Sequence, residues 1–146
     1  RLLVDLILPA DERSGSATDA RVPEFMDFLM DDQPERRTAM RGGLAWLDVE
    51  SLERFDRRFV DASDEERASL LDAIAYPDRA SDELSHGVEF FSRFRDLTAT
   101  GFFTSKMGFE DLQYMGNEHV TEWTGCPPEA LTKLGLDTGR GEREEG

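Results

Sequence analysis

The stretch from Ser85 to Gly116, SHGVEFFSRFRDLTATGFFTSKMGFEDLQYMG, holds six of the ten phenylalanines of this 146-residue chain. Up to about Thr100, its apolar residues recur at steps of three and four, with charged residues such as Glu89 and Arg93 between them. This spacing predicts an amphipathic helix that buries one face. After Gly101 the period is lost while the apolar content stays high. The rings of this second part must therefore be buried, either in the chain's own core or against another protein.

Both kinds of burial are open for the second part of the stretch. For Phe90, Phe94 and Leu97, which keep the helical period, we expect core burial. Beyond Gly101 an interface is as good an explanation, because aromatic residues and methionine are enriched at the centres of protein interfaces. The candidate interface residues are Phe102, Phe103, Met107, Phe109, Tyr114, Met115 and Trp123.

The segments before this stretch also predict helices. A short helix begins near Pro23, and a longer one follows Pro34. The longer helix contains the pair Gly42-Gly43, which we expect to mark close packing against a neighbouring backbone. A further helix is predicted to start at Ser63, because Ser63 and Glu66 have the spacing of a capping box.

The two ends of the chain are less regular. Leu2 to Leu8 has the pattern of a helix end stopped by Pro9, and a polar loop rich in glycine, serine and aspartate follows. Near the C-terminus, Pro127-Pro128 predicts one short helix closed by Gly135. We found no internal repeat and no convincing strand. The prediction is an all-α chain with one compact helical domain over residues 1–136, including a long irregular N-terminal loop and a C-terminal extension, and a mobile tail over residues 137–146.

Charge and hydropathy exclude several classes of partner. The formal net charge is −15, and no cluster of lysine and arginine supplies a face for nucleic acid or anionic lipid. No apolar run approaches the roughly 20 residues that span a bilayer, so we expect no direct membrane insertion. The acidity itself fits an ordinary soluble surface. It also fits an independent acidic scaffold from a salt-rich habitat.

Few residues are suited to catalysis or metal binding. The single cysteine, Cys126, and the two histidines, His86 and His119, are the material for a small stand-alone enzyme or metal-binding protein. Their ordinary explanations are a small apolar residue in a tail and a histidine bonded locally near a helix start. We predict no catalytic, cofactor-binding or metal-binding residue in this chain, and keep the stand-alone enzyme or metal protein as the alternative.

Six blocks of sequence resemble a known family in the family's order. They are LILPADE, VPEFMDFLM, GLAWLD, PDRASDELSHGVEFFSRFRDLTATGFFTSKMG, DLQYMGN and WTGCPPEAL, which together span Leu6 to Leu134. In these blocks the chain resembles the gluconate 2-dehydrogenase subunit 3 family, the small subunits of bacterial membrane-associated sugar dehydrogenase complexes. The long central block is the most specific of the six.

The resemblance implies a partner protein rather than a catalyst. In such complexes a large flavoprotein subunit of the glucose–methanol–choline oxidoreductase type binds FAD and oxidises a sugar or sugar acid. It passes electrons onward, often to a multihaem cytochrome c subunit. The small subunit supports folding and carries the twin-arginine signal that exports the folded large subunit to the periplasm. The present sequence shows no such signal, and we expect that segment to precede the mature part.

The resemblance also gives Cys126 a specific role. In the related glucose dehydrogenases, a small-subunit cysteine in a WxGCP context is expected to form a disulfide with the large subunit. Trp123, Thr124, Gly125, Cys126 and Pro127 match that context. The resemblance therefore implies an intersubunit disulfide at Cys126, which an oxidising periplasm would permit.

Overall fold

The computed structural model describes residues 1–117, 119, 121–122 and 125–136. It divides the chain into two units, Arg1–Tyr114 and Met115–Gly146. Every regular element in the described part is helical, which confirms the all-α prediction. The predicted domain boundary after residue 136 stays a prediction, and the tail predicted over 137–146 lies outside the described residues. No helix in the described part is long and apolar enough to cross a bilayer.

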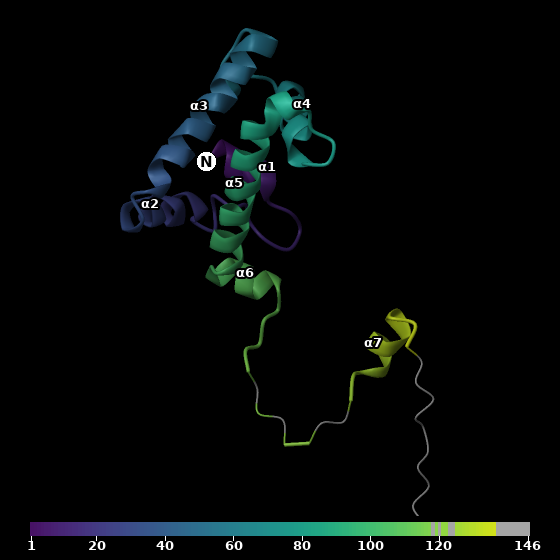
Figure 1. Ribbon diagram of the computed structural model, residues 1–146. Coiled ribbons are helices and arrows are strands. Elements are labelled where there is room, and N and C mark those ends of the chain that lie inside the picture. Colours follow the sequence, from purple (N-terminus) through teal and green to yellow (C-terminus); the bar gives the residue numbers. More distant parts are fainter. Residues whose placement is uncertain (118, 120, 123–124, 137–146) are drawn as a thin grey trace, which may run out of the picture. The chain divides into compact units, whose positions relative to one another are not determined.

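Helix α5 (Ser85–Phe103) is the central element of the first unit (Figure 1). It packs against α1 (Leu2–Ile7), α2 (Val22–Asp32), α3 (Arg36–Phe55), α4 (Asp64–Ala75) and α6 (Lys106–Asp111). Its buried face is larger than the period up to Thr100 predicted, because the helix continues through Gly101 to Phe103. The residues of that face are Gly87, Phe90, Phe91, Phe94, Thr98, Gly101 and Phe102.

Two glycines allow α3 and α5 to pack closely. A Cβ built on Gly43 would lie 1.8 Å from Cδ2 of Phe90, and one built on Gly87 would lie 2.2 Å from Cη2 of Trp46. Each helix thus offers a glycine to the aromatic ring of the other. The predicted close approach is confirmed at Gly43, although the neighbouring group is a side chain and not a backbone. At Gly42 it is wrong, because no atom lies within 4 Å of the added Cβ.

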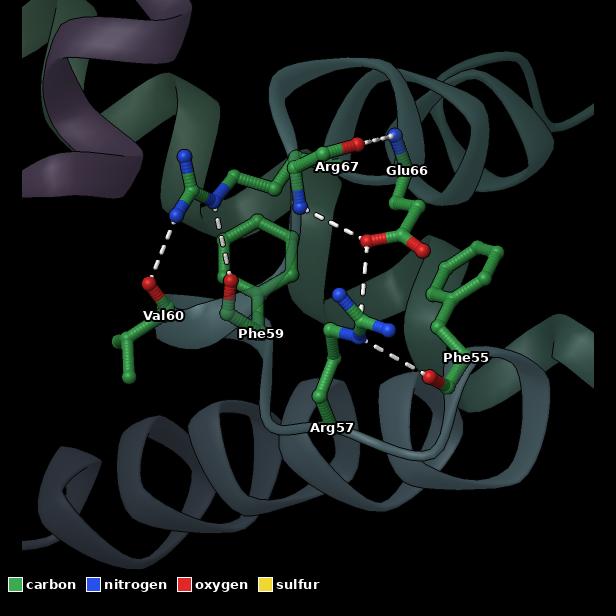
Figure 2. Close-up of polar contacts among 7 residues, drawn as sticks. Phe55, Arg57, Phe59, Val60, Glu66 and Arg67 are labelled. Carbon is green, nitrogen blue, oxygen red and sulfur yellow. Dashed lines mark hydrogen bonds and ion pairs between the residues drawn. The ribbon is translucent and has the colours of Figure 1, made fainter.

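The capping box before α4 forms as predicted. The hydroxyl of Ser63 accepts a hydrogen bond from the Glu66 amide at 3.2 Å, and the Glu66 carboxylate accepts one from the Ser63 amide at 2.8 Å. Arg57 and Arg67 extend this network (Figure 2). Nε of Arg57 lies 3.9 Å from the Glu66 carboxylate. Arg67 donates to the carbonyl oxygens of Phe59 and Val60 in the 3₁₀ helix η1 (Phe59–Asp61), at 3.0 and 2.7 Å. The start of α4 is therefore bonded to the chain that leads into it.

The polar loop between α1 and α2 is anchored by hydrogen bonds at both ends. The amide of Ala17 donates to the carbonyl of Leu8 at 2.9 Å, and the amide of Val22 donates to the carbonyl of Ala17 at 3.0 Å. Ala17 is fully buried although it lies in the middle of a polar segment. Thr18 donates from its amide and its hydroxyl to the carboxylate of Asp5, at 2.8 and 2.7 Å. The loop is thus held in a defined conformation by hydrogen bonds and by the burial of Ala17.

Two short elements complete the description. The 3₁₀ helix η2 (Asp82–Leu84) leads directly into α5. In the second unit, α7 (Pro128–Lys133) is the short helix predicted after the proline pair. Gly135 follows it with a φ of 65°, in the left-handed region that glycine adopts without strain.

Candidate partner-binding surface

Helix α6 and the turn after it carry two exposed aromatic residues, Phe109 and Tyr114, and the sequence pattern did not predict this helix. Its N-cap is Ser105, whose hydroxyl accepts a hydrogen bond from the Gly108 amide at 3.1 Å. The same hydroxyl donates to the carbonyl of Phe102 at 2.6 Å. One serine side chain thus joins the end of α5 to the start of α6. Only Thr104 and Ser105 separate the two helices, and this short connection restricts the orientation of α6 relative to α5.

The inner face of α6 is fixed by Gly108. A Cβ on Gly108 would lie 2.2 Å from the carbonyl oxygen of Phe102 and 2.6 Å from Cα of Phe103. These are backbone atoms, which cannot rotate away as a side chain can. Glycine is therefore the residue that lets the backbone of α6 lie directly on the end of α5.

The outer face of α6 and the turn after it expose three large apolar side chains. Phe109, Leu112 and Tyr114 are 43%, 56% and 59% exposed. The rings of Phe109 and Tyr114 meet edge to face, with centroids 5.3 Å apart and planes at 68°. The amide of Tyr114 donates to the carbonyl of Phe109 at 3.0 Å, and Gln113 between them has a φ of 53°. We call these three residues the α6 patch.

The structure divides the predicted interface residues into several groups. Phe102 is only 3% exposed and belongs to the hydrophobic core, so its assignment to a partner interface is corrected. Its position one turn after Thr98 places it on the buried face of α5. Phe103 and Met107 are partly buried and pack against the same core. Two members of the α6 patch, Phe109 and Tyr114, were on the predicted list, and Leu112 was not.

The other predicted residues belong to the second unit. Met115 is exposed there. Trp123 lies outside the described residues. Cys126 is a free thiol and is exposed, as the predicted disulfide with another chain requires. The disulfide itself stays a prediction.

The two histidines lie in different units. His86 is exposed at the start of α5, and His119 is exposed in the second unit together with Cys126. Among the described residues, no group of three or more histidine, cysteine, aspartate or glutamate side chains is placed to hold a metal ion. No observation in the described part of the structure specifically favours a stand-alone enzyme or metal protein that uses His86, His119 and Cys126.

A groove between α3 and α5 is a further surface feature that the sequence did not reveal. Its volume is about 770 Å³. Its apolar lining includes Met40, Trp46, Phe94 and Leu97. Its charged lining residues are Glu35, Arg36, Glu89, Arg93 and Asp96. Gly42, Gly43 and Phe90 also line the groove, so it includes the close approach of α3 and α5. Sequence spacing alone does not reveal such a groove, because its shape depends on the angle between the helices.

The pKa values of two aspartates, Asp5 on α1 and Asp11 in the loop that follows, are lowered from their ordinary values. Burial raises the pKa of Asp5. The hydrogen bonds from the Thr18 hydroxyl and amide lower it by more, so the net change in the pKa is downward. The pKa of Asp11 is also lowered, because its carboxylate accepts bonds from the amides of Ser14 and Arg13. Both carboxylates therefore stay ionised at neutral pH and hold the loop in shape.

Comparison with known proteins gives one match. The model of the family described as gluconate 2-dehydrogenase subunit 3 matches residues 1–123, which include the whole first unit with its core and the α6 patch. Comparison with curated proteins and with solved structures yields no match. The family match covers most of the 146 residues. The chain therefore belongs to the gluconate 2-dehydrogenase subunit 3 family, and is an accessory subunit of a dehydrogenase complex.

Proposed function

We propose that this chain is the small subunit that supports folding, stability and twin-arginine export of a periplasmic, FAD-dependent dehydrogenase subunit. The large subunit is a flavoprotein of the glucose–methanol–choline type that oxidises a sugar or sugar acid. This chain binds no cofactor of its own and contributes no catalytic residue. A cytochrome c subunit with haem accepts the electrons where the complex includes one.

The α6 patch is the observation that supports a partner most directly. Three large side chains, two of them in ring contact, are exposed on a backbone that Ser105 and Gly108 hold against α5. Exposed apolar rings give a free monomer no stability, whereas their burial in an interface contributes favourable free energy to binding. Fixed aromatic side chains also lose little conformational freedom on binding, which makes them effective anchors. The patch therefore serves as the docking site for the large subunit.

Cys126 gives the complex a covalent link. Its thiol is exposed in the second unit, where a cysteine of the large subunit can reach it. An oxidising periplasm keeps such a bond formed. The disulfide is the second point of attachment, separate in the chain from the α6 patch.

The proposal is tested by expressing the large subunit with and without this chain. We expect the large subunit alone to show poor export and a low yield of FAD-loaded protein, with both restored by co-expression. Full yield, correct localisation and full activity without this chain would refute the role.

Variants of the patch then locate the contact. The double substitution Phe109→Ala and Tyr114→Ala should weaken capture of the large subunit, because both rings leave the interface. The matched control is Phe28→Ala, which removes another phenylalanine that is 68% exposed, on α2. Equal effects of the two changes would show that exposed aromatic area in general, and not the α6 patch, governs assembly.

A further inference from the structure

The N-terminal loop contains a closed turn that presents one arginine. The carboxylate of Asp11 accepts hydrogen bonds from the amides of Arg13 and Ser14, at 2.8 and 2.9 Å. The amide of Asp11 donates to the carbonyl of Ser14 at 3.0 Å, which closes the turn from the other side. An aspartate that bonds the amides two and three residues ahead is a common way to stabilise such a turn. The backbone at Arg13 is therefore held in place before its side chain meets anything else.

The side chain of Arg13 reaches the C-terminal end of α6, 98 residues away in sequence. Its Nη2 donates to the carbonyl of Asp111 and lies 3.1 Å from the carboxylate oxygen Oδ1 of the same residue. Carbonyl groups at a helix C-terminus have no partner within the helix, and their dipoles favour a positive charge. Arg13 thus makes a hydrogen bond to the carbonyl and an ion pair with the carboxylate of Asp111, the last residue of α6.

A second contact joins the same loop to the middle of α6. A Cβ on Gly15 would lie 3.1 Å from Cε of Met107, so the methionine side chain lies against the loop backbone. The middle of the loop is anchored as well, because Ala17 is buried and hydrogen-bonded at its amide and its carbonyl. The loop is therefore a preformed support against one side of α6.

We infer that the loop between α1 and α2 is a brace for α6, and that Arg13 is a positioning residue for the α6 patch. This inference rests on the proposed docking of the large subunit through that patch. A helix of six residues does not persist on its own in water. Ser105 and Gly108 fix its N-terminal end on α5, and Arg13 fixes its C-terminal end, next to Leu112 and Tyr114.

Arg13 affects binding by keeping α6 ordered, and not by contacting the large subunit itself. Without Arg13, the last turn of α6 can fray, and Tyr114 loses the fixed partner of its ring. The large subunit would then have to order this segment on binding, which weakens affinity. The Arg13 side chain is 66% exposed, although Asp111 is only 19% exposed, and an ion pair with one arm in solvent adds little to global stability. The fold itself should therefore hardly change.

The test compares Arg13→Ala with Arg58→Ala in the full chain. Arg58 is a matched control, because it is similarly exposed and makes an ion pair with Asp61 at 2.9 Å on η1. Hydrogen exchange of the Phe109 and Leu112 amides, which bond to Ser105 and Gly108, reports the order of α6 in the free subunit. We expect Arg13→Ala to speed this exchange and to leave the thermal midpoint and the exchange of α5 unchanged. Arg58→Ala should change neither amide.

Binding to the purified, FAD-loaded large subunit gives the second measurement. We expect Arg13→Ala to raise Kd about three- to tenfold, in line with the cost of ordering a few residues on binding. Arg13→Lys, which keeps the charge, should recover part of the loss. Asp111→Asn should add little once Arg13 is gone, because both act through the same contact.

The outcomes separate the brace from the proposed function. Unchanged exchange at Phe109 and Leu112 in Arg13→Ala would overturn the brace, whatever the binding result. Faster exchange with unchanged Kd would show that α6 is braced but that its order does not govern docking, which also overturns the inference. A wild-type chain that does not bind the large subunit would refute the proposed function, while the exchange data would still decide whether the loop orders α6.

Discussion

Gly43 on α3 lies directly against the ring of Phe90 on α5, so close that a Cβ on the glycine would be 1.8 Å from Cδ2 of the ring. The adjacent Gly42 faces open space, with no atom within 4 Å of an added Cβ. Two neighbouring glycines in one helix therefore have opposite relations to the core. Packing requires glycine at position 43, whereas Gly42 only weakens the helix.

Alanine at these two positions should have effects of opposite sign. Gly43→Ala should lower the free energy of unfolding by about 1–3 kcal/mol, because the methyl group forces the Phe90 ring out of its place. Gly42→Ala should raise it by up to about 1 kcal/mol, through the better helix propensity of alanine. Urea unfolding followed by far-UV circular dichroism measures both. A stable Gly43→Ala variant would show that α3 and α5 can separate without loss.

Ser51 is a buried serine whose hydroxyl has no hydrogen-bond partner in the structure. Its replacement by alanine removes an unsatisfied polar group from the core and keeps the Cβ. We expect Ser51→Ala to be neutral or to stabilise the chain by up to about 1 kcal/mol, since leaving such a group buried without a partner is what costs free energy. Thermal unfolding compares the variant with the wild type.

Ser63→Ala is the natural control for that change. It removes the hydroxyl that caps α4 and accepts the Glu66 amide. Loss of an N-cap of this kind costs about 1 kcal/mol, so Ser63→Ala should destabilise the chain. If both serine variants lost stability equally, Ser51 would have a partner that it does not show in the structure.

The acid sensitivity of the fold should depend on Asp5. Its pKa is lowered in the folded chain, because the bonds from Thr18 outweigh the opposing effect of burial. A carboxylate with a lowered folded pKa stabilises the fold above its unfolded pKa of about 3.9, and the stabilisation is lost as pH falls through the folded value. Asp5→Asn should therefore be less stable than the wild type at pH 7, with a gap that narrows below about pH 4. Unfolding free energies measured between pH 7 and pH 3 check this, and a gap that stays constant over that range would contradict it.

Much of the first unit was predictable from local signals. The period of α5 and the capping box at Ser63 each arise from a few neighbouring residues. The pair Gly42-Gly43 indicated a close approach of another element, without identifying that element as the ring of Phe90. The sequence pattern places the end of α5 too early, because the apolar period fails after Gly101. In the structure Gly101 is a packing residue, since a Cβ there would lie 2.7 Å from the ring of Phe25. With the helix continuing, Phe102 falls one turn after Thr98 and enters the core.

Helix α6 and its brace were beyond the reach of local patterns. Six residues with an internal glycine give no usable period, and the helix forms because Gly108 can lie on the Phe102 carbonyl. The contact of Arg13 with Asp111 joins residues 98 positions apart. Such contacts depend on the folded arrangement of α1, α5 and α6 together. The exposed patch was therefore only partly predicted, as a list of aromatic residues without the helix that presents them.

Gly108 provides a test of that helix from its inner side. Gly108→Ala places a methyl group against the backbone of Phe102 and Phe103, which cannot rotate away. We expect α6 to leave α5, with loss of about 1–3 kcal/mol of stability and with weakened capture of the large subunit. Gly42→Ala, the same change in open space, is the control. Unimpaired capture by a folded Gly108→Ala variant would show that the position of α6 does not matter for docking.

The final prediction concerns the thiol of Cys126, which is exposed in the second unit. If it forms the proposed disulfide, the complex isolated from the periplasm should run as one joined band on a non-reducing gel and as two bands after reduction. Cys126→Ser should give two bands in both conditions and lose complex on dilution, because the remaining contacts are reversible. The matched control is Ser81→Cys, which offers an exposed thiol in the first unit away from the α6 patch and should not restore the joined band in the Cys126→Ser background. Separate bands from the wild type without reductant would exclude the disulfide and leave the α6 patch as the proposed attachment.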